Sequence, residues 1–244
     1  MFDPFNDFEQ AGYLRNNFQE KDPDIVRHLE HMMFRAGLDD ALVFLEKRAV
    51  LRYEDFLEVH RILFQEFYPW AGQDRQITAP SFSVSKAGTI FCHPRDARRA
   101  VEEGLRIGQD KDAMCKRPGE VMGYFAYGHP FLDGNGRTML LIHSELCHRA
   151  GFCIEWQYTS KNDYLRALSH EIESPSQGVL DNYLQDFIVD SHGRELWSSS
   201  IHDIQGLNGG DRVQNTVDGE YTDAQVEQEY RAFDMKREKS KQSI

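Results

Sequence analysis

Hydrophobic residues recur at helical spacing along most of this chain. Between residues 24 and 47 they fall three or four positions apart, which predicts an amphipathic helix with a break near Gly37. Residues 53–67 repeat the pattern, and the proline and glycine that follow mark the end of that helix. The same spacing predicts further helices over residues 96–107, 119–127, 138–150, 161–172 and 179–189.

One stretch departs from the helical pattern. Residues 76–92 carry β-branched and aromatic residues on both sides of Lys86, Ala87 and Gly88, which predicts a β-hairpin with its turn near Gly88. The predicted fold class is therefore all-α with one small hairpin.

The composition changes at about residue 198. Residues 206–219 are polar and glycine-rich, and residues 223–241 are densely charged. Such segments have too few apolar residues to form a core of their own. We therefore predict a folded domain over residues 1–197 and, over residues 198–244, a polar linker followed by a charged, solvated tail that is helical in part.

Charge and cysteine usage exclude several classes of protein. The 28 Lys and Arg residues against 40 Asp and Glu residues give a net charge of −12, which argues against binding to a nucleic acid duplex. The chain lacks an apolar run of membrane-spanning length and a secretory signal. Its four cysteines form no C-x-x-C pair and are typical of reduced thiols. We predict a cytoplasmic protein with no membrane contact, and delivery into a host cell stays open.

The strongest chemical signal is the nine-residue segment HPFLDGNGR, which runs from His129 to Arg137. Gly134 and Gly136 flank Asn135 and allow consecutive backbone N–H groups to turn toward an anion. The helix predicted directly afterwards adds the free amides and positive dipole end of its N-terminus. Arg137 in the first helical turn opposes that dipole unless an anion lies between the two, which is a second indication of an anionic ligand.

Two side chains of this segment supply further chemistry. Asp133 offers the hard oxygen that Mg²⁺ prefers beside phosphates. His129 is suited to accept a proton from a hydroxyl group. Together they indicate phosphoryl or nucleotidyl transfer. The alternative is a plain turn, because Asp-Gly and Asn-Gly are common turn signals, although the helical flanks weaken that interpretation.

The segment resembles the signature of the Fic (Fido) family, H-x-F-x-D/E-G-N-G-R-x-x-R. The stretch YPWAGQDR at residues 68–75 is similar to the family's Y-x-W-A-G-x-x-R, and GYLRN at residues 12–16 resembles its L-R-N entry. The resemblance covers about residues 10–195. It implies that residues 1–197 are a Fic (Fido) domain, with a helical fold and a hairpin flap over the active site.

The resemblance also implies an activity. The chain would be a nucleotidyltransferase of the EC 2.7.7 type that moves AMP from ATP to a Ser, Thr or Tyr hydroxyl of a target protein with the help of Mg²⁺. The target segment would pair with the flap, which runs from Thr78 to Ile90. The implied roles are a general base (His129), a Mg²⁺ ligand (Asp133), an anion hole (Gly134, Asn135, Gly136), a phosphate-binding cation (Arg137) and a residue of the adenine pocket (Tyr164).

One departure from the signature keeps alternatives open. Its last Arg would stand at position 140, where this chain has Leu140. The donor could then carry UMP, phosphocholine or phosphate instead of AMP, or the chain could be a catalytically weak binding module.

The sequence leaves the control of the activity open. Residues 191–195 and 169–173 match only part of the family's inhibitory S/T-x-x-x-E-G/N motif. A separate antitoxin protein stays open, as does the role of toxin, effector or housekeeping regulator.

Overall fold

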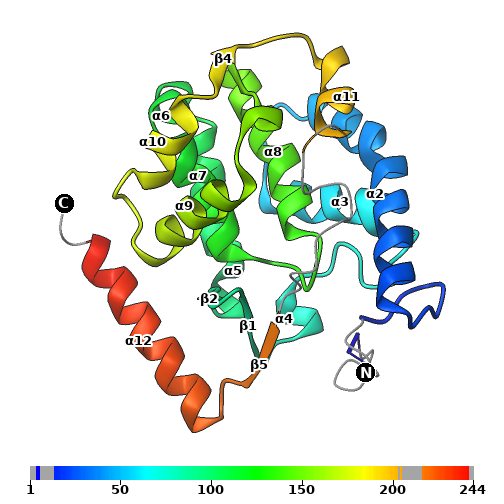
Figure 1. Cartoon of the computed structure of the whole chain (residues 1–244), viewed down its shortest axis with the longest axis vertical. Coiled ribbons are helices and arrows are strands. Elements are labelled where there is room, and N and C mark those ends of the chain that lie inside the picture. The colour runs from blue at the N-terminus through cyan, green and yellow to red at the C-terminus, as the bar shows by residue number, and fades with distance from the viewer. Residues whose placement is uncertain (1–3, 6–13, 203, 205–215, 242–244) are drawn as a thin grey trace.

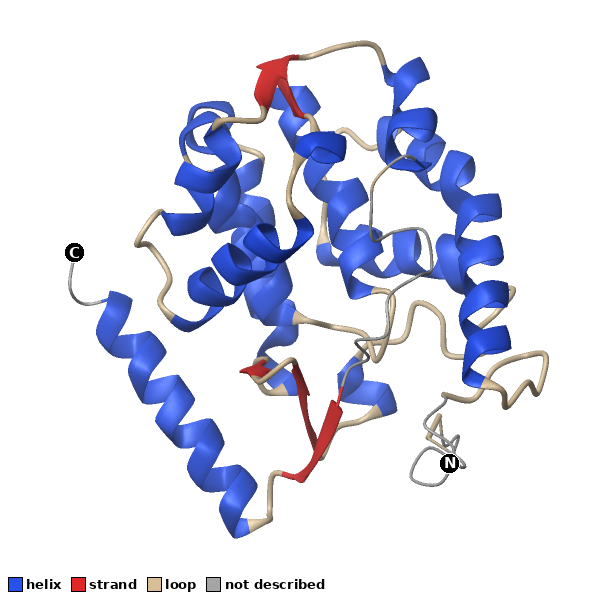
Figure 2. Ribbon diagram, in the orientation of Figure 1, coloured by secondary structure: helices blue, strands red, loops and turns tan. Residues whose placement is uncertain are grey.

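The computed structural model describes residues 4–5, 14–202, 204 and 216–241, and it confirms a helical fold with a small hairpin (Figures 1 and 2). Helices α7 and α8 lie at the centre, with α2 and α3 on one side and α9 and α10 on the other (Figure 1). The helices are α2 (Pro23–Glu46), α3 (Tyr53–Phe64), α4 (Arg75–Thr78), α5 (Pro94–Gly108), α6 (Lys111–Lys116), α7 (Pro118–Gly128), α8 (Asn135–Ala150), η1 (Trp156–Tyr158), α9 (Lys161–Glu173), α10 (Val179–Gln185), η2 (Arg194–Leu196), α11 (Trp197–His202) and α12 (Ala224–Lys241).

The break predicted near Gly37 is wrong, because α2 continues through that residue. Asp22 caps the N-terminus of the helix, because its side chain accepts hydrogen bonds from the backbone N–H groups of the first turn, and Pro23 is the first helical residue. Gly37 is the point where α2 packs closely on α3, since a Cβ there would lie 2.7 Å from the Ile62 carbonyl oxygen. The glycine therefore serves a close helix contact and not a turn.

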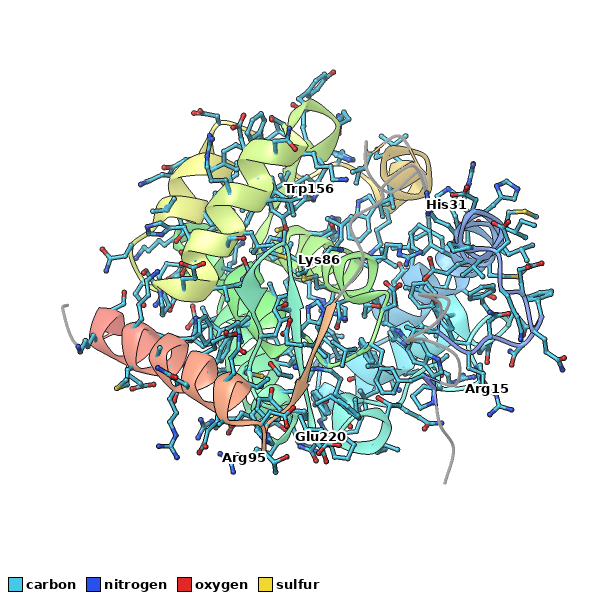
Figure 3. The ribbon with its side chains drawn as sticks, turned by 60° about the horizontal axis from the view of Figure 1, so that its bottom comes forward. Arg15, His31, Lys86, Arg95, Trp156 and Glu220 are labelled. Carbon is cyan, nitrogen blue, oxygen red and sulfur yellow. The ribbon has the colours of Figure 1, made fainter. Side chains whose placement is uncertain are left out.

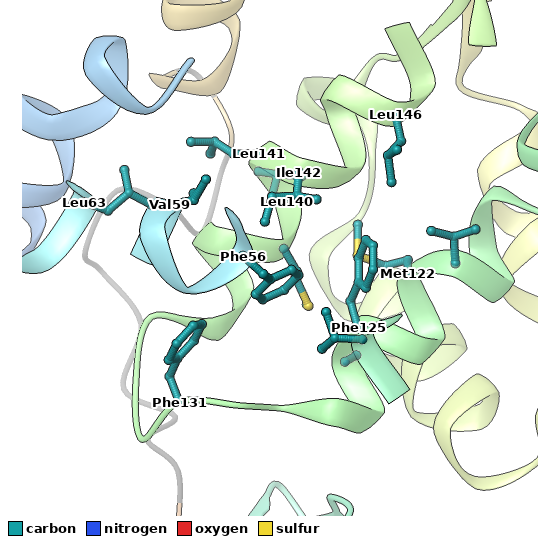
Figure 4. Close-up of a cluster of buried hydrophobic side chains, with 14 of the residues drawn as sticks. Phe56, Val59, Leu63, Met122, Phe125, Phe131, Leu140, Leu141, Ile142 and Leu146 are labelled. Carbon is teal, nitrogen blue, oxygen red and sulfur yellow. The ribbon is translucent and has the colours of Figure 1, made fainter. Parts of the chain in front are cut away.

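The hydrophobic core lies where α3, α7 and α8 meet, and Figure 4 shows part of it. The apolar stripe of the predicted helix over residues 53–67 contributes Phe56, Val59 and Leu63, which are fully buried. Leu140 belongs to the same cluster and is 6% exposed. Position 140 is therefore a core position in this chain.

The predicted hairpin is present as β1 (Phe82–Lys86) and β2 (Thr89–Ile90), which pair antiparallel. Ala87 and Gly88 between them both have positive φ angles, as tight hairpin turns require. The strand begins later than predicted, because residues 75–78 form the short helix α4. A second small sheet, β3 (Phe152–Ile154) with β4 (Ile188–Asp190), connects the end of α8 to the chain after α10.

Residues 216–241 lie in the segment predicted as a solvated tail that is helical in part, and they form a strand and a largely exposed helix that contact the domain. Strand β5 (Thr216–Glu220) pairs antiparallel with β1 and makes a three-stranded sheet of order β2-β1-β5. Helix α12 then runs back along the molecule, and its Phe233 and Arg237 are buried. Much of the predicted linker, residues 205–215, lies outside the described residues. The expected boundary at residue 197 falls at the start of α11, whose Trp197 and Ile201 pack into the core.

Two further observations concern the described helices and the cysteines. Among the helices that the structure describes, none combines the length and the apolar character needed to cross a bilayer. All four cysteines are free thiols.

A buried carboxyl group lies where α7 and α9 touch. Glu171 accepts a hydrogen bond from the Ser176 backbone N–H, and its side chain fills the space opposite Gly123, where a Cβ would come within 2.4 Å of it. Burial raises the pKa of Glu171 to about 7, helped by Asp181 and Glu120 and opposed by Arg237.

We predict that Glu171→Gln stabilises the protein at pH 8.5 but not at pH 5. In the folded chain the pKa of Glu171 lies above its ordinary value of 4.5, so its contribution to stability is present below pH 4.5 and is lost as the pH rises through 7. The variant should gain a few degrees in Tm at pH 8.5, since about 1 kcal/mol moves Tm by about 2–4 °C at this size. The exposed Glu66→Gln is the matched control, and equal Tm gains at both pH values would contradict the assignment.

Candidate active site

The site begins at an unusual backbone conformation at the end of α7. His129 caps this helix with φ 37° and ψ 57°, in the left-handed region. For a residue with a Cβ this conformation costs roughly 1–2 kcal/mol. It turns the chain sharply out of α7 into the loop, so other contacts must hold the residue in place.

Arg75 supplies those contacts from a fully buried position. Its Nε donates to the His129 carbonyl at 2.7 Å and its Nη2 to the Cys92 carbonyl at 2.8 Å, while its backbone N–H donates to the Pro130 carbonyl at 2.7 Å. One guanidinium thus joins the strained histidine to the chain that follows the hairpin. The arginine of the YPWAGQDR stretch is a positioning residue for His129, a role that the sequence alone did not reveal.

The His129 imidazole packs face to face on Phe91, with ring centroids 3.5 Å apart and an angle of 5° between the rings. Phe91 directly follows β2, so the hairpin and the histidine share a contact. His129 is only 7% exposed. The aromatic ring of Phe91 therefore covers one face of the imidazole.

The loop after His129 is closed by the side chain of Asn135. Its Nδ2 donates to the Phe131 carbonyl at 2.7 Å, and its Oδ1 accepts from the Phe131 backbone N–H at 2.9 Å. Phe131 is fully buried, and its ring stacks on His60 with the ring centroids 3.7 Å apart. The Asn135 side chain therefore holds the loop shape, which leaves only its backbone N–H for a ligand.

His60 supports the loop from beneath, on the buried face of α3. Its Nδ1 accepts from the Gly72 backbone N–H at 2.9 Å, so its Nε2 carries the proton and donates to the Asp133 carbonyl at 3.0 Å. Burial lowers the pKa of His60 to about 3, which keeps the ring neutral. Sequence reasoning missed this residue. The signal that could have revealed it is its position four residues after Phe56, which places a histidine on the apolar stripe of the helix.

The two glycines of the loop differ in their surroundings. Gly134 has φ +77°, and a Cβ there would lie 2.5 Å from the Phe64 ring, so only glycine fits. A Cβ at Gly136 would meet nothing within 4 Å. The first helical hydrogen bond of α8 runs from the Thr138 N–H to the Gly134 carbonyl. The N–H groups of residues 135–137 precede it and have no intrahelical acceptor, and the open space beside Gly136 lies among them.

Asp133 borders the same space and is 43% exposed on its side chain. Its Oδ1 accepts from the Gly134 N–H at 2.6 Å and lies 3.7 Å from Arg137 Nη2. Within the described residues, no three His, Cys, Asp or Glu side chains gather to hold a metal ion. A single carboxylate nevertheless fits Mg²⁺, which commonly takes one or two protein ligands and completes its shell with water and phosphate oxygens.

Arg137 already faces a carboxylate of the chain itself. Its Nη2 donates to Glu30 Oε1 of α2 at 2.6 Å, and its guanidinium lies 4.6 Å from the Phe64 ring. Burial raises the pKa of Glu30, and the charge of Arg137 opposes that effect. The sequence argument took this arginine as a sign of a bound anion. The structure supplies Glu30 as that anion, and nothing in the local sequence linked α2 to the loop.

Tyr164 lies in the first half of α9, where its ring packs edge-on against Trp156 at 5.3 Å. Burial raises the pKa of its phenol. The structure thus brings the predicted residues from 129 to 137 together. Tyr164 instead packs against Trp156, the aromatic residue that follows β3. The adenine role of Tyr164 stays a prediction.

Comparison with known proteins finds a family match and several similar sequences. Residues 50–147 match the model of the Fic/DOC family. The chain is 29% identical to "Probable protein adenylyltransferase y4lH" of Sinorhizobium fredii over 164 residues, which is 64% of this chain and 81% of that protein. It is 29% identical to protein adenylyltransferase VbhT of Bartonella schoenbuchensis over 118 residues, which is 45% of this chain but only 24% of VbhT.

Two solved structures resemble the fold. The BepC protein of Bartonella tribocorum, solved with bound AMPPNP, superposes with a TM-score of 0.62 at 16% identity and covers 75% of this chain and 96% of that one. The N-terminal Fic domain of a VirB-translocated Bep effector protein from Bartonella quintana, solved with bound ADP, gives a TM-score of 0.62 at 18% identity, covering 78% and 96%. At these identities the likeness concerns the fold.

We predict that Arg75→Lys lowers the free energy of unfolding by about 2–3 kcal/mol, because a lysine ammonium cannot reach both carbonyls and leaves one buried acceptor unsatisfied. Urea unfolding monitored by circular dichroism measures this loss. Arg99→Lys, at an exposed position of α5, is the matched control and should change stability little. Equal effects of the two substitutions would show that Arg75 does not hold the loop.

Proposed function

The chain belongs to the Fic/DOC family through residues 50–147, and from that premise we propose that it is a protein adenylyltransferase. It transfers AMP from ATP to a Ser, Thr or Tyr hydroxyl of a target protein. The observation that carries the proposal is a histidine, held in a strained conformation by Arg75, at the start of the loop that leads into the N-terminus of α8. A base next to an amide-lined anion cradle is the arrangement that phosphate transfer needs.

The phosphates lie at the start of α8 in this proposal. The backbone N–H groups of Asn135, Gly136 and Arg137 would bind the phosphate oxygens, and the helix dipole would add to their attraction. The N–H of Gly134 joins them once the Asp133 carboxylate turns away from it. Bound Mg²⁺ supplies charge neutralisation on the phosphates, and Asp133 is its protein ligand.

His129 carries the proton transfer. Its imidazole accepts the proton of the acceptor hydroxyl, and the hydroxyl oxygen forms a bond to the α-phosphorus of ATP. The bond from that phosphorus to the bridging oxygen of the β-phosphate breaks, and pyrophosphate leaves. The backbone carbonyl of His129 stays bound to Arg75 throughout, so the ring is presented from a fixed backbone position.

The target protein docks along the flap, from Thr78 to Ile90. An extended segment of the target pairs through its main chain with a strand of the hairpin, which brings one of its hydroxyls toward His129. The stacking of Phe91 on His129 connects the hairpin to the base and supports this placement.

A second candidate is the transfer of a different phosphate-containing group, such as UMP, phosphocholine or phosphate. The observation that favours it is the core position of Leu140, where the family signature has a cation. The family resemblance implies that this cation contacts the γ-phosphate of the donor. Of the donors considered, CDP-choline has no γ-phosphate and would not need the cation, whereas ATP and UTP both carry one. Comparison of ATP, UTP and CDP-choline as donors in one assay separates the two candidates, and near-zero turnover with all of them indicates a binding module.

The setting proposed for the reaction is the cytoplasm, where ATP and reduced thiols coexist. The solved Bartonella neighbours are described as VirB-translocated effector proteins, so a cytoplasm entered after translocation fits the proposal equally well. Control by a separate antitoxin protein is compatible with both.

We predict that His129→Asn abolishes AMP transfer, because the amide cannot accept the proton of the hydroxyl. Asn is the better replacement than Ala, since it tolerates the left-handed conformation of this position. Intact-mass spectrometry of the chain and of lysate proteins with ATP and Mg²⁺ measures the addition of AMP. His28→Asn, at an exposed position of α2, is the control. Undiminished transfer by His129→Asn would overturn the proposed mechanism.

We also predict that Glu30→Gln tightens the binding of ADP without metal, up to about tenfold, because the charge of Arg137 is then no longer neutralised. The same change should lower Tm, since it leaves a buried cation without its partner. Isothermal titration with ADP and a thermal melt test the two effects together. Weaker ADP binding in a folded Glu30→Gln protein would mean that Glu30 orients Arg137 for the phosphate and does not compete with it.

A further inference from the structure

The hairpin has one edge that can accept another strand. On the side of β2, the hairpin faces α9, and Thr89 Oγ1 donates to Ser169 Oγ at 2.9 Å. The opposite edge belongs to β1, the longer strand. In this structure that edge is occupied by β5, and Figure 3 shows the two strands side by side, with Glu220 at one end and Lys86 toward the other.

The main chain and the side chains both take part in the pairing of β5 with β1. The register places Val217 opposite Val84 and Thr216 opposite Ser85, with a bulge between Ser83 and Val84. The Asp218 carboxylate accepts from Ser85 Oγ at 2.6 Å and from Ser83 Oγ at 3.4 Å. The edge of β1 thus recognises an extended backbone and a carboxylate.

The residues after β5 hold the strand in place. The Tyr221 N–H donates to the Ser81 carbonyl at 2.9 Å, and its ring stacks on His93 at 4.3 Å. Helix α12 is fixed further along, where the Arg237 guanidinium covers the Tyr127 ring at 3.7 Å and bonds to the Ile172 carbonyl. The strand is therefore tethered on its C-terminal side by a helix that packs on the domain.

The occupied edge lies close to the base. The Val84 carbonyl accepts from the Phe91 N–H at 3.2 Å, and Phe91 stacks on His129. Val217 pairs with the other side of Val84, so it lies about two strand spacings, or about 10 Å, from Phe91. A target segment that presents a hydroxyl to His129 from this edge would need the place that β5 fills.

We infer that β5 is a tethered competitor for the edge of β1, and this inference rests on the proposed function. The partner that this edge fits is an extended peptide with an acidic residue opposite Ser83 and Ser85. A short tether gives a bound segment an effective concentration of the order of millimolar, so a free segment of similar affinity cannot displace it at micromolar concentration. A target gains access to the edge of β1 when β5 leaves.

The test uses the full chain with a substitution that releases β5. Val217→Pro removes the backbone N–H of Val217 and disfavours the strand. Val217→Thr keeps both the N–H and the β-branched shape and is the matched control. Asp218→Lys is the second releasing variant, because its exposed side chain contributes to the pairing but not to the core.

Two readouts do not depend on enzymatic transfer. The first is amide hydrogen exchange of residues 82–86, which should speed up in Val217→Pro and Asp218→Lys but not in Val217→Thr. The second is fluorescence anisotropy with a labelled peptide of residues 216–222, TVDGEYT. This peptide should bind Val217→Pro at least about tenfold more tightly than wild type. The Asp218→Asn form of the peptide should bind more weakly, because its bonds to Ser83 and Ser85 lose the charge of the acceptor.

AMP transfer to target proteins then separates the inference from the proposed function. The inference expects faster transfer in both releasing variants than in Val217→Thr. Unchanged exchange in β1 together with equal peptide binding in all variants would overturn it, even if transfer is measurable. A third outcome is faster exchange in β1 and tighter peptide binding in the releasing variants, but no AMP transfer by any variant. That outcome would support the docking edge and contradict the proposed activity.

Discussion

The site depends on the hydrogen bonds by which Arg75 holds His129 in a left-handed conformation. Without them the end of α7 would relax, because the conformational energy cost of the left-handed His129 is comparable to the net stabilisation from one or two hydrogen bonds. The same guanidinium binds the Cys92 carbonyl, so the hairpin, the base and the loop start share one anchor. The loop then continues on a second buried support, His60, which fixes the Asp133 carbonyl.

The sequence predicted those parts that local rules determine. The helical periodicity, the hairpin turn at Ala87 and Gly88 and the glycine-flanked loop follow from spacing and from φ angles. It failed where the outcome depends on contacts between distant segments. Gly37 was taken as a break because its close contact with Ile62 of α3 cannot be read locally. The pairing of β5 with β1 was missed for the same reason, since residues 216–220 are too polar to signal a strand.

Charge balance around the loop follows from three groups that come from separate elements. Arg137 stands between Glu30 of α2 and Asp133 of the loop, so the α8 N-terminus carries a cation that is largely neutralised by the chain itself. Leu140 adds no charge one turn later. The attraction for phosphates therefore rests mainly on backbone amides, which cannot be lost by substitution of a side chain and which act at short range.

The positions of Glu30 and β5 have a practical consequence for the smallest fragment that reproduces the native site. Both lie outside residues 50–147, the part that matches the family model. A fragment cut to those limits would keep His129, Asp133 and both loop glycines, but Arg137 would lose its ion pair with Glu30 and the flap would expose an unpaired strand edge. Such edges invite self-association between molecules. Biochemical work on this protein should therefore span α2 to α12.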